Sequence, residues 1–270
     1  QFGCDIRTID EIAASDDVDA VAICTPTDTH ADLIEQFVRA GKAVFCEKPV
    51  DLNANRVREC LATVEAENGH LMLGFQRRFD PDFMALKAAI DAGQIGEVEM
   101  IVITSRDPGA PPYDYIERSG GIFRDMTVHD LDVARWLLGE EVISVQASAS
   151  VLTDPKIGEH GDYDSANLIL KTASGKLCAI TNSRRAAYGY DQRIEVHGSK
   201  GSVSAGNQHE ANIEIATARG YQRPPLLDFF MTRYTRAYAN EIEAFVNAVE
   251  NNTEMPITGT DGLRALELAD

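Results

Sequence analysis

The first 75 residues alternate apolar runs with helical patterns, and this alternation is the feature that most restricts the fold. Buried strands are predicted at residues 19–24, 42–46 and 70–75. Between them, the spacing of apolar side chains predicts helices over residues 30–40 and 53–67. Strands that alternate with helices imply right-handed crossovers and a parallel sheet covered on both faces. The pattern therefore predicts an α/β domain with a parallel sheet.

The pattern changes near residues 93–96. From Glu97 onward, strand-like runs follow one another with few helices between them, and turn signals such as Ala173-Ser174-Gly175-Lys176 join neighbouring runs. This predicts an open, mainly antiparallel sheet with helices on one face, and hence two domains, residues 1–95 and 96–270. The helices include one that carries residues 125–132, a long one over 229–250 and one over 259–270. The expected strands are 98–104, 142–151, 166–171, 177–183 and 193–197.

The first domain lacks the opening that a doubly wound nucleotide-binding domain usually has. Such a domain starts with a strand, a glycine-rich turn and a helix. Residues 1–18 contain no G-x-G-x-x-G. We therefore expect that the glycine-loop part is missing from this chain, or that the chain ends are not covered.

The charge of the chain excludes several classes of partner. A net charge of −18 argues against nucleic acid and anionic membranes, because phosphate groups bind clustered Lys and Arg. No apolar run approaches the roughly 20 residues that span a bilayer. The five cysteines have no C-x-x-C spacing, which predicts reduced, mostly buried thiols in a cytoplasmic protein.

Asp125, His129 and Asp132 are the strongest candidates for chemistry. At i, i+4 and i+7 they would share one face of a helix with 3.6 residues per turn. A carboxylate beside an imidazole orients the ring and favours its protonated form, which suits a general base. Two other interpretations stay open: a histidine satisfied by packing, and a divalent metal site, although no second His or Cys has ligand spacing. The preceding Gly120-Gly121 either lets the backbone approach a ligand or forms a turn.

Polar residues also gather where the predicted parallel strands end. T-P-T-D-T-H occupies residues 25–30 and E-K-P occupies 47–49, and ligands of open α/β sheets bind outside these strand ends. The first segment is either part of such a site or a turn with a helix cap at Asp28 or Thr29. Lys48 is either a solvated turn lysine or a ligand contact. Tyr190 is either a packing aromatic or a contact for a hydroxyl-rich ligand.

Four motifs taken together resemble one known family. T-P-T-D-T-H, E-K-P, F-Q-R-R-F-D and G-G-I-F-R-D-M-T-V-H-D-L-D follow the order and spacing of the glucose–fructose oxidoreductase/inositol dehydrogenase (Gfo/Idh/MocA) family. With Ser-Arg-Asp-Pro at 105–108, the chain most resembles bacterial inositol 2-dehydrogenases. The resemblance implies a partial Rossmann-type dinucleotide-binding domain, followed by an α+β domain that binds substrate and builds a homo-oligomer, a dimer or a homotetramer. It also implies oxidation of a ring hydroxyl of myo-inositol to an inosose with NAD. NADP is not excluded, because the acidic residue that reads the adenosine ribose after the second strand is absent.

The resemblance also implies roles for single residues. His129 would be the general base, Asp125 its partner and Lys48 the residue that assists hydride transfer at the reacting hydroxyl. The family's cofactor contacts fall on Thr25, Pro26, His30, Glu47, Lys48, Gln76 and Arg77. Its substrate contacts fall on Lys48, Asp107, Asp125, His129, Asp132 and Tyr190, with Arg106 as a further candidate. No metal ligand is expected.

Three alternatives are kept beside this reading. The nearest is the same NAD(P)-dependent chemistry on scyllo-inositol or another sugar or polyol. A second is a non-catalytic dinucleotide-binding regulator, which would have no need for Lys48, Asp125 and His129 together. A third is a metal-dependent hydrolase that uses Asp125 and His129, which a chelator would inhibit.

Overall fold

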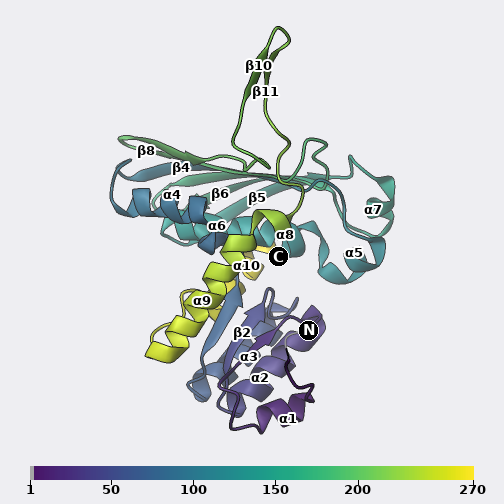
Figure 1. Ribbon diagram of the computed structural model, residues 1–270, viewed down its shortest axis with the longest axis vertical. Coiled ribbons are helices and arrows are strands. Elements are labelled where there is room, and N and C mark those ends of the chain that lie inside the picture. Colours follow the sequence, from purple (N-terminus) through teal and green to yellow (C-terminus); the bar gives the residue numbers. More distant parts are fainter. Residues whose placement is uncertain (1–2) are drawn as a thin grey trace. The chain divides into compact units, whose positions relative to one another are not determined.

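The computed structural model describes residues 3–270, which form two compact units (Figure 1). The first unit holds the chain up to Phe75 together with Glu241–Glu267. The second holds Gln76–Asn240 and Leu268–Asp270. The division into a dinucleotide-binding and a substrate-binding part at residues 95 and 96 stays a prediction.

The first unit is built on a three-stranded parallel sheet in the order β1-β2-β3. Every residue of the middle strand except its last is buried, as a sheet covered on both faces requires. The amphipathic helix between β1 and β2 turns Ile34, Phe37 and Val38 inward. The predicted alternation of strands and helices is therefore confirmed. The elements are α1 (Ile9–Ala13), β1 (Ala20–Ile23), the 3-10 turn η1 (Thr27–Thr29), α2 (His30–Arg39), β2 (Ala43–Glu47), α3 (Ala54–Ala66) and β3 (Leu71–Gly74).

The last part of the chain completes the core of this unit. Phe245 of α9 (Thr235–Asn251) packs against Phe45, with ring centroids 5.9 Å apart. In α10 (Gly259–Ala269), a Cβ on Gly259 would lie 2.1 Å from a methyl carbon of Leu61. The absence of a side chain at this position therefore lets α10 pack closely against the unit.

The second unit is built on a six-stranded mixed sheet in the order β5-β6-β7-β4-β8-β9. Only the β4–β7 pair is parallel, so the expected open, mainly antiparallel sheet is confirmed. Residues of β6 alternate between buried and exposed, because α4 and α6 cover one face of the sheet (Figure 1). The strands are β4 (Val98–Arg106), β5 (Val142–Ser150), β6 (Ser165–Thr172), β7 (Leu177–Ser183), β8 (Asp191–Gly198) and β9 (Gly201–Ala205).

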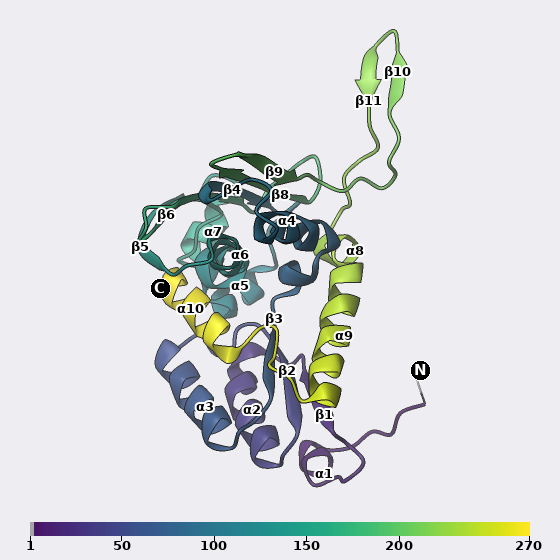
Figure 2. The ribbon, with the colours of Figure 1, turned by 90° about the vertical axis from the view of Figure 1, so that its left-hand side faces the viewer.

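The helices of this unit are mostly short. They are the 3-10 turn η2 (Gln76–Phe79), α4 (Pro81–Asp91), α5 (Tyr113–Ser119), the π-helical turn η3 (Phe123–Thr127), α6 (Val128–Leu138), α7 (Pro155–Glu159) and α8 (Phe230–Arg233). The prediction of a single long helix over residues 229–250 is wrong in one respect. The helix is interrupted at Tyr234, which separates α8 from α9. A hairpin of β10 (Ile215–Thr217) and β11 (Gly220–Gln222), which the sequence did not indicate, projects from the unit (Figure 2).

Cysteine placement and helix length add two findings. No disulfide joins the cysteines within residues 3–270, and Cys46, Cys60 and Cys178 are buried. Within the same residues, none of the helices has the length and apolar character needed to cross a membrane.

Candidate active site

Two left-handed glycines lead into the segment that carries the candidate base. Gly120 ends α5 with a φ of 84°, and Gly121 follows with a φ of 82°. A Cβ on Gly121 would lie 2.8 Å from Oδ1 of Asp162, and the same oxygen accepts a hydrogen bond from the Ile122 amide at 2.8 Å. The glycines therefore form a turn that lets Asp162 bind the backbone where the next helix begins.

A π-helical turn then replaces the regular helix that the sequence predicted. Phe123–Thr127 forms this turn, and α6 begins only at Val128. Hydrogen bonds in a π-helix run from i to i+5, so residues before and after it do not follow the 3.6-residue spacing. The prediction of one uninterrupted α-helix through Asp125, His129 and Asp132 was therefore wrong. Such turns are frequent at functional sites.

Asp125 lies in the π-helical turn and contacts two polar side chains. The Tyr115 hydroxyl donates a hydrogen bond to Oδ1 at 2.8 Å. Oδ2 faces the guanidinium of Arg184, with Nη1 at 3.5 Å. Arg184 is only 1% exposed and also faces Asp162, with Nη2 3.4 Å from Oδ2. Sequence reasoning missed Arg184, whose only signal was its position directly after the predicted strand 177–183.

His129 and Asp130 begin α6, and Asp130 is part of a polar network that the sequence did not indicate. His129 is half-buried, whereas Asp130 is completely buried and forms an ion pair with Arg77. Asp130 also accepts a hydrogen bond from Asn182 Nδ2 at 2.7 Å. Arg77 donates a further hydrogen bond to the Ser105 hydroxyl at 3.1 Å. These bonds connect η2, β4, α6 and β7.

The network changes the interpretation of Arg77, which the family resemblance placed at the cofactor together with Gln76. Both side chains are buried within the second unit. Burial alone would lower the pKa of Arg77, but the Asp130 carboxylate raises it, so the guanidinium stays charged. The positive charge of Arg77 is therefore paired with the carboxylate of Asp130. A direct contact of Arg77 or Gln76 with the cofactor stays a prediction.

Asp132 likewise forms an ion pair with an arginine. Arg78 binds it with two hydrogen bonds, from Nε to Oδ2 at 2.9 Å and from Nη2 to Oδ1 at 2.5 Å. Asp132 is completely buried. A bidentate pair of this kind fixes both partners. The geometry therefore favours a role in holding η2 on α6, and the predicted substrate contact of Asp132 is not tested.

Asp107 and Tyr190 lie within electrostatic reach of the same charged residues. Asp107 follows β4, and its amide donates a hydrogen bond to the Ser183 carbonyl at 2.9 Å. Burial raises the pKa of Asp107 to about 6, although Arg77 and Arg184 oppose the rise. Tyr190 is buried, and its ring meets that of Tyr234 edge to face at 6.0 Å. Burial is also the main cause that raises the pKa of Tyr190, whose phenol therefore stays neutral.

Arg106 is engaged elsewhere. Its Nη1 donates a hydrogen bond to the Tyr188 hydroxyl at 3.0 Å, and that hydroxyl donates to Asp191 at 2.6 Å. The second unit thus brings together five charged or phenolic groups around Asp107. They are Arg77, Asp125, Asp130, Arg184 and Tyr190.

In the first unit, a buried histidine connects the ends of two strands. The register pairs Ile23 of β1 with Cys46 of β2, so the segments after both strands leave from the same edge of the sheet. His30 places Nε2 2.7 Å from the Thr25 carbonyl and Nδ1 2.8 Å from the Pro49 carbonyl. With both nitrogens used, His30 fixes the two candidate cofactor segments, and a direct contact of its ring with the cofactor stays a prediction.

The T-P-T-D-T segment forms the predicted turn. Thr29 occupies the N-cap of α2, but its hydroxyl donates to the Pro26 carbonyl at 2.8 Å and makes no capping bond to α2. The Thr25 and Thr29 hydroxyls are 2.6 Å apart. The cap interpretation is therefore right about position and wrong about the hydrogen bond.

At the end of β2, Glu47 is accompanied by a second buried carboxyl group. Burial raises the pKa of Glu47, while Lys48 and His30 oppose the rise. Glu241 of α9 is 1% exposed, and burial together with Glu47 raises its pKa to about 9. Glu241 is therefore a neutral carboxylic acid at physiological pH.

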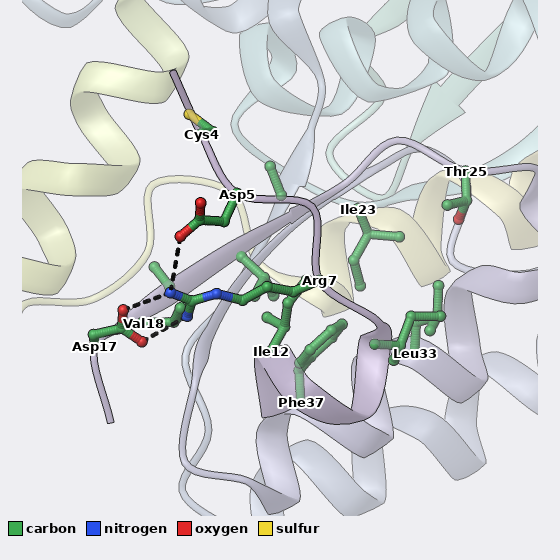
Figure 3. A pocket seen from close by; sticks show the side chains of 14 residues that line it. Cys4, Asp5, Arg7, Ile12, Asp17, Val18, Ile23, Thr25, Leu33 and Phe37 are labelled. Atoms are coloured by element: carbon green, nitrogen blue, oxygen red, sulfur yellow. Dashed lines mark hydrogen bonds and ion pairs between the residues drawn. The ribbon is translucent and has the colours of Figure 1, made fainter. Parts of the chain in front are cut away.

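A cavity of about 600 Å³ runs along β1, the edge strand of this sheet (Figure 3). Its walls are mainly apolar and include Ile12, Ile23 and Phe37, with Thr25 at one end. Arg7, which also lines the cavity, is held by Asp17, with nitrogen–oxygen distances of 2.7 and 2.8 Å. Because this charge is already compensated, the cavity is suited to an apolar occupant rather than to an anion.

Two candidate cofactor residues follow neighbouring strands of the first unit. Thr25 is exposed and Lys48 is half-exposed, and they follow neighbouring parallel strands. A glycine loop for the pyrophosphate is not among residues 3–270. The same residues contain no group of three or more His, Cys, Asp or Glu side chains that could hold a metal ion.

Comparison with known proteins gives matches along most of the chain. Residues 2–75 match the family model for an oxidoreductase family with an NAD-binding Rossmann fold, and residues 83–204 match the GFO/IDH/MocA C-terminal domain. Over 269 residues the chain is 68% identical to inositol 2-dehydrogenase of Rhizobium meliloti (strain 1021), covering 100% of this chain and 82% of that protein.

Solved structures show the same similarity. Myo-inositol dehydrogenase from Corynebacterium glutamicum has a TM-score of 0.94 at 42% identity, covering 98% of this chain and 79% of that one. Scyllo-inositol dehydrogenase from Lactobacillus casei, solved with NAD(H) and scyllo-inositol, has a TM-score of 0.89 at 31% identity. That match covers 97% of this chain and 79% of the other.

Proposed function

The chain belongs to the Gfo/Idh/MocA family of NAD-dependent oxidoreductases acting on CH–OH groups, and from this premise we propose that it is an inositol 2-dehydrogenase. Its reaction would oxidise one ring hydroxyl of myo-inositol to an inosose, with NAD as the oxidant. The proposed substrate rests on the 68% identity, over nearly the whole chain, to a protein named inositol 2-dehydrogenase.

In this proposal His129 is the general base. A carbon releases hydride readily only as its hydroxyl loses the proton, and a positioned imidazole can accept that proton. Asp125 supports the ring and stabilises the imidazolium that forms. The Asp125 carboxylate itself is positioned by the Tyr115 hydroxyl at 2.8 Å and by Arg184 at 3.5 Å.

Lys48 supplies the electrostatic part of the mechanism. Its ammonium group would donate a hydrogen bond to the reacting hydroxyl and stabilise the negative charge that develops on oxygen. Thr25, Pro26 and Glu47, at the ends of β1 and β2, would hold the nicotinamide end of the cofactor, with His30 fixing the two segments. NAD, when bound, supplies the hydride acceptor.

Asp107 and Tyr190 would contact the remaining hydroxyls of the ring. A carboxyl group and a neutral phenol can each accept or donate hydrogen bonds to a polyol. Both lie within electrostatic reach of Asp125 or Arg77, which supports one substrate-facing cluster in the second unit. Asp132 is given a positioning role through Arg78.

A second candidate is the same reaction on scyllo-inositol. It is favoured by the similarity to a scyllo-inositol dehydrogenase solved with that substrate and NAD(H). The two isomers differ in the orientation of a single hydroxyl, so the choice depends on the residues that meet this group.

The test is to incubate the protein with NAD or NADP and a panel of inositols and aldoses, while following reduced nicotinamide by absorbance. Oxidation of myo-inositol with the highest kcat/KM supports the proposal, and preference for scyllo-inositol supports the second candidate. Cofactor binding without turnover of any polyol would instead indicate a dinucleotide-binding regulator. Activity abolished by a chelator would contradict both dehydrogenase candidates.

A cytoplasmic location and a homo-oligomer, specifically a homotetramer, are also part of this proposal. The second is supported by the open face of the six-stranded sheet, where Met100, Val102 and Ile169 are each nearly half exposed. Apolar side chains that gather on one open face are typical of subunit interfaces.

A further inference from the structure

Two tyrosines of α5 each donate a hydrogen bond to an aspartate, but in different places. Tyr113 donates to Oδ2 of Asp154 at 2.6 Å, and Tyr115 donates to Oδ1 of Asp125 at 2.8 Å. Because the tyrosines are two residues apart on a helix, they point to different sides of it. One aspartate starts the short helix α7, and the other is the proposed partner of the general base.

The Tyr115 hydroxyl is well suited to act as a permanent donor. Tyr115 is 44% exposed, but desolvation of its hydroxyl, followed by the charge of Asp125, raises the pKa of the phenol above its ordinary value. The phenol therefore keeps its proton throughout the pH range in which such an enzyme works. A carboxylate can accept a hydrogen bond but has no proton to donate. Tyr115 is therefore always the donor of this bond and Asp125 the acceptor.

The remainder of α5 is fixed at its other side. The ring of Tyr113 stacks on His160 with centroids 5.5 Å apart and an angle of 18°. His160 Nδ1 also lies 2.9 Å from Oε1 of Glu117. Since Tyr113, His160 and Glu117 hold α5 against α7, the Tyr115 hydroxyl reaches Asp125 from an anchored helix rather than from a free loop.

We infer that Tyr115 is a positioning residue of the proposed dehydrogenase, which orients the carboxylate of Asp125, the proposed partner of the His129 base. The inference rests on the proposed function. With Oδ1 bound to Tyr115 and Oδ2 facing Arg184, the carboxylate plane is held from both sides. Loss of the hydroxyl would remove one of the contacts that orient the Asp125 carboxylate, while its charge remains.

The test compares Tyr115→Phe with Tyr113→Phe, because each removes one phenol–carboxylate hydrogen bond from the same helix. We expect Tyr115→Phe to lower kcat on the best polyol about tenfold, with KM changed by less than about twofold. Tyr113→Phe should leave kcat and KM unchanged within about twofold.

A double-mutant cycle adds a readout that a merely structural role would not move. In an Asp125→Ala background, adding Tyr115→Phe should lower kcat by less than about twofold, because the acceptor is already gone. A full tenfold loss in that background would overturn the inference, and so would a Tyr115→Phe variant that behaves like Tyr113→Phe. Circular dichroism and the midpoint of thermal unfolding serve as the folding control for both variants. A wild-type protein inactive on every polyol would refute the proposed function instead.

Discussion

Arg77 and Asp130 form an ion pair in the interior of the second unit, although 53 residues separate them in the chain. Asp130 is completely buried and Arg77 is 5% exposed. Taking two charges out of water costs several kcal/mol for each ion, so such a pair persists only where further hydrogen bonds complete it. Ser105 and Asn182 supply those bonds. The pair thus fixes the start of α6, the helix that carries His129, on η2 and two strands.

Asp130→Asn is expected to lower the free energy of unfolding by about 3 kcal/mol, because it leaves the Arg77 charge buried without its partner. Urea unfolding followed by circular dichroism measures this change. Asp91→Asn is the matched control, since it breaks the Lys87–Asp91 pair on the surface of α4. Its cost should stay within about 0.5 kcal/mol, as for other exposed i,i+4 pairs. Equal losses in the two variants would contradict the role given to the buried pair.

His129→Ala is expected to lower turnover about 10²- to 10⁴-fold, which is the usual contribution of a positioned base. The fold should survive, because the side chain is only half-buried. Steady-state kinetics with the best polyol and NAD provides the measurement. His70→Ala, at the amino end of β3 and away from the strand ends proposed to hold NAD, should keep turnover within about twofold. Near-normal turnover in His129→Ala would remove His129 from the mechanism.

Periodicity was enough to predict the three parallel strands of the first unit, the two helices between them and most strands of the second unit. The strands that were missed have few apolar residues: β9 offers Val203 and Ala205, and the β10–β11 hairpin leaves Ile215 and Tyr221 exposed. Without a buried face, a short strand produces no alternation of apolar and polar residues to detect. Such strands depend on pairing with a neighbour, which the sequence does not display.

The candidate site was less predictable than the fold, for two physical reasons. The π-helical turn at Phe123–Thr127 has the composition of an ordinary helix, so the prediction of a regular α-helix had nothing to correct it. The partners of the charged groups are also remote in sequence: Arg184 lies 59 residues from Asp125. Helical spacing identifies neighbours within one helix, whereas these contacts depend on how separate elements pack.

Glu241→Gln is expected to change how stability depends on pH. Burial raises the pKa of Glu241 to about 9, whereas an unfolded glutamate titrates near about 4.3. Between these values the folded protein binds a proton that the unfolded chain releases, so the contribution of Glu241 to stability is lost as pH rises. Relative to the variant, the wild type should lose on the order of 2 kcal/mol between about pH 5 and 8.

Denaturant unfolding of both proteins at several pH values measures this difference. Glu243→Gln, at an exposed position on the same helix, is the control. Its free energy of unfolding should change with pH in the same way as that of the wild type. Parallel curves for Glu241→Gln and wild type would mean that the Glu241 carboxyl is ionised in the folded protein. Glu47 is present in all three proteins, so its own raised pKa cancels in the comparison.

Replacing both Val102 and Ile169 with aspartate is expected to dissociate the proposed homo-oligomer. The register places Val102 of β4 beside Ala179 of β7, and Ala179 beside Ile169 of β6, so the three form one row across the open sheet face. Val102 is 46% and Ile169 47% exposed. Burying such area stabilises association by roughly 25 cal/mol per Å², and two buried unpaired charges would more than cancel this. Sedimentation velocity should show a smaller species for the double variant Val102→Asp/Ile169→Asp. The control is Ile213→Asp, which lies outside the six strands of the sheet and should sediment like the wild type. An unchanged sedimentation coefficient in the double variant would exclude this face as the subunit interface.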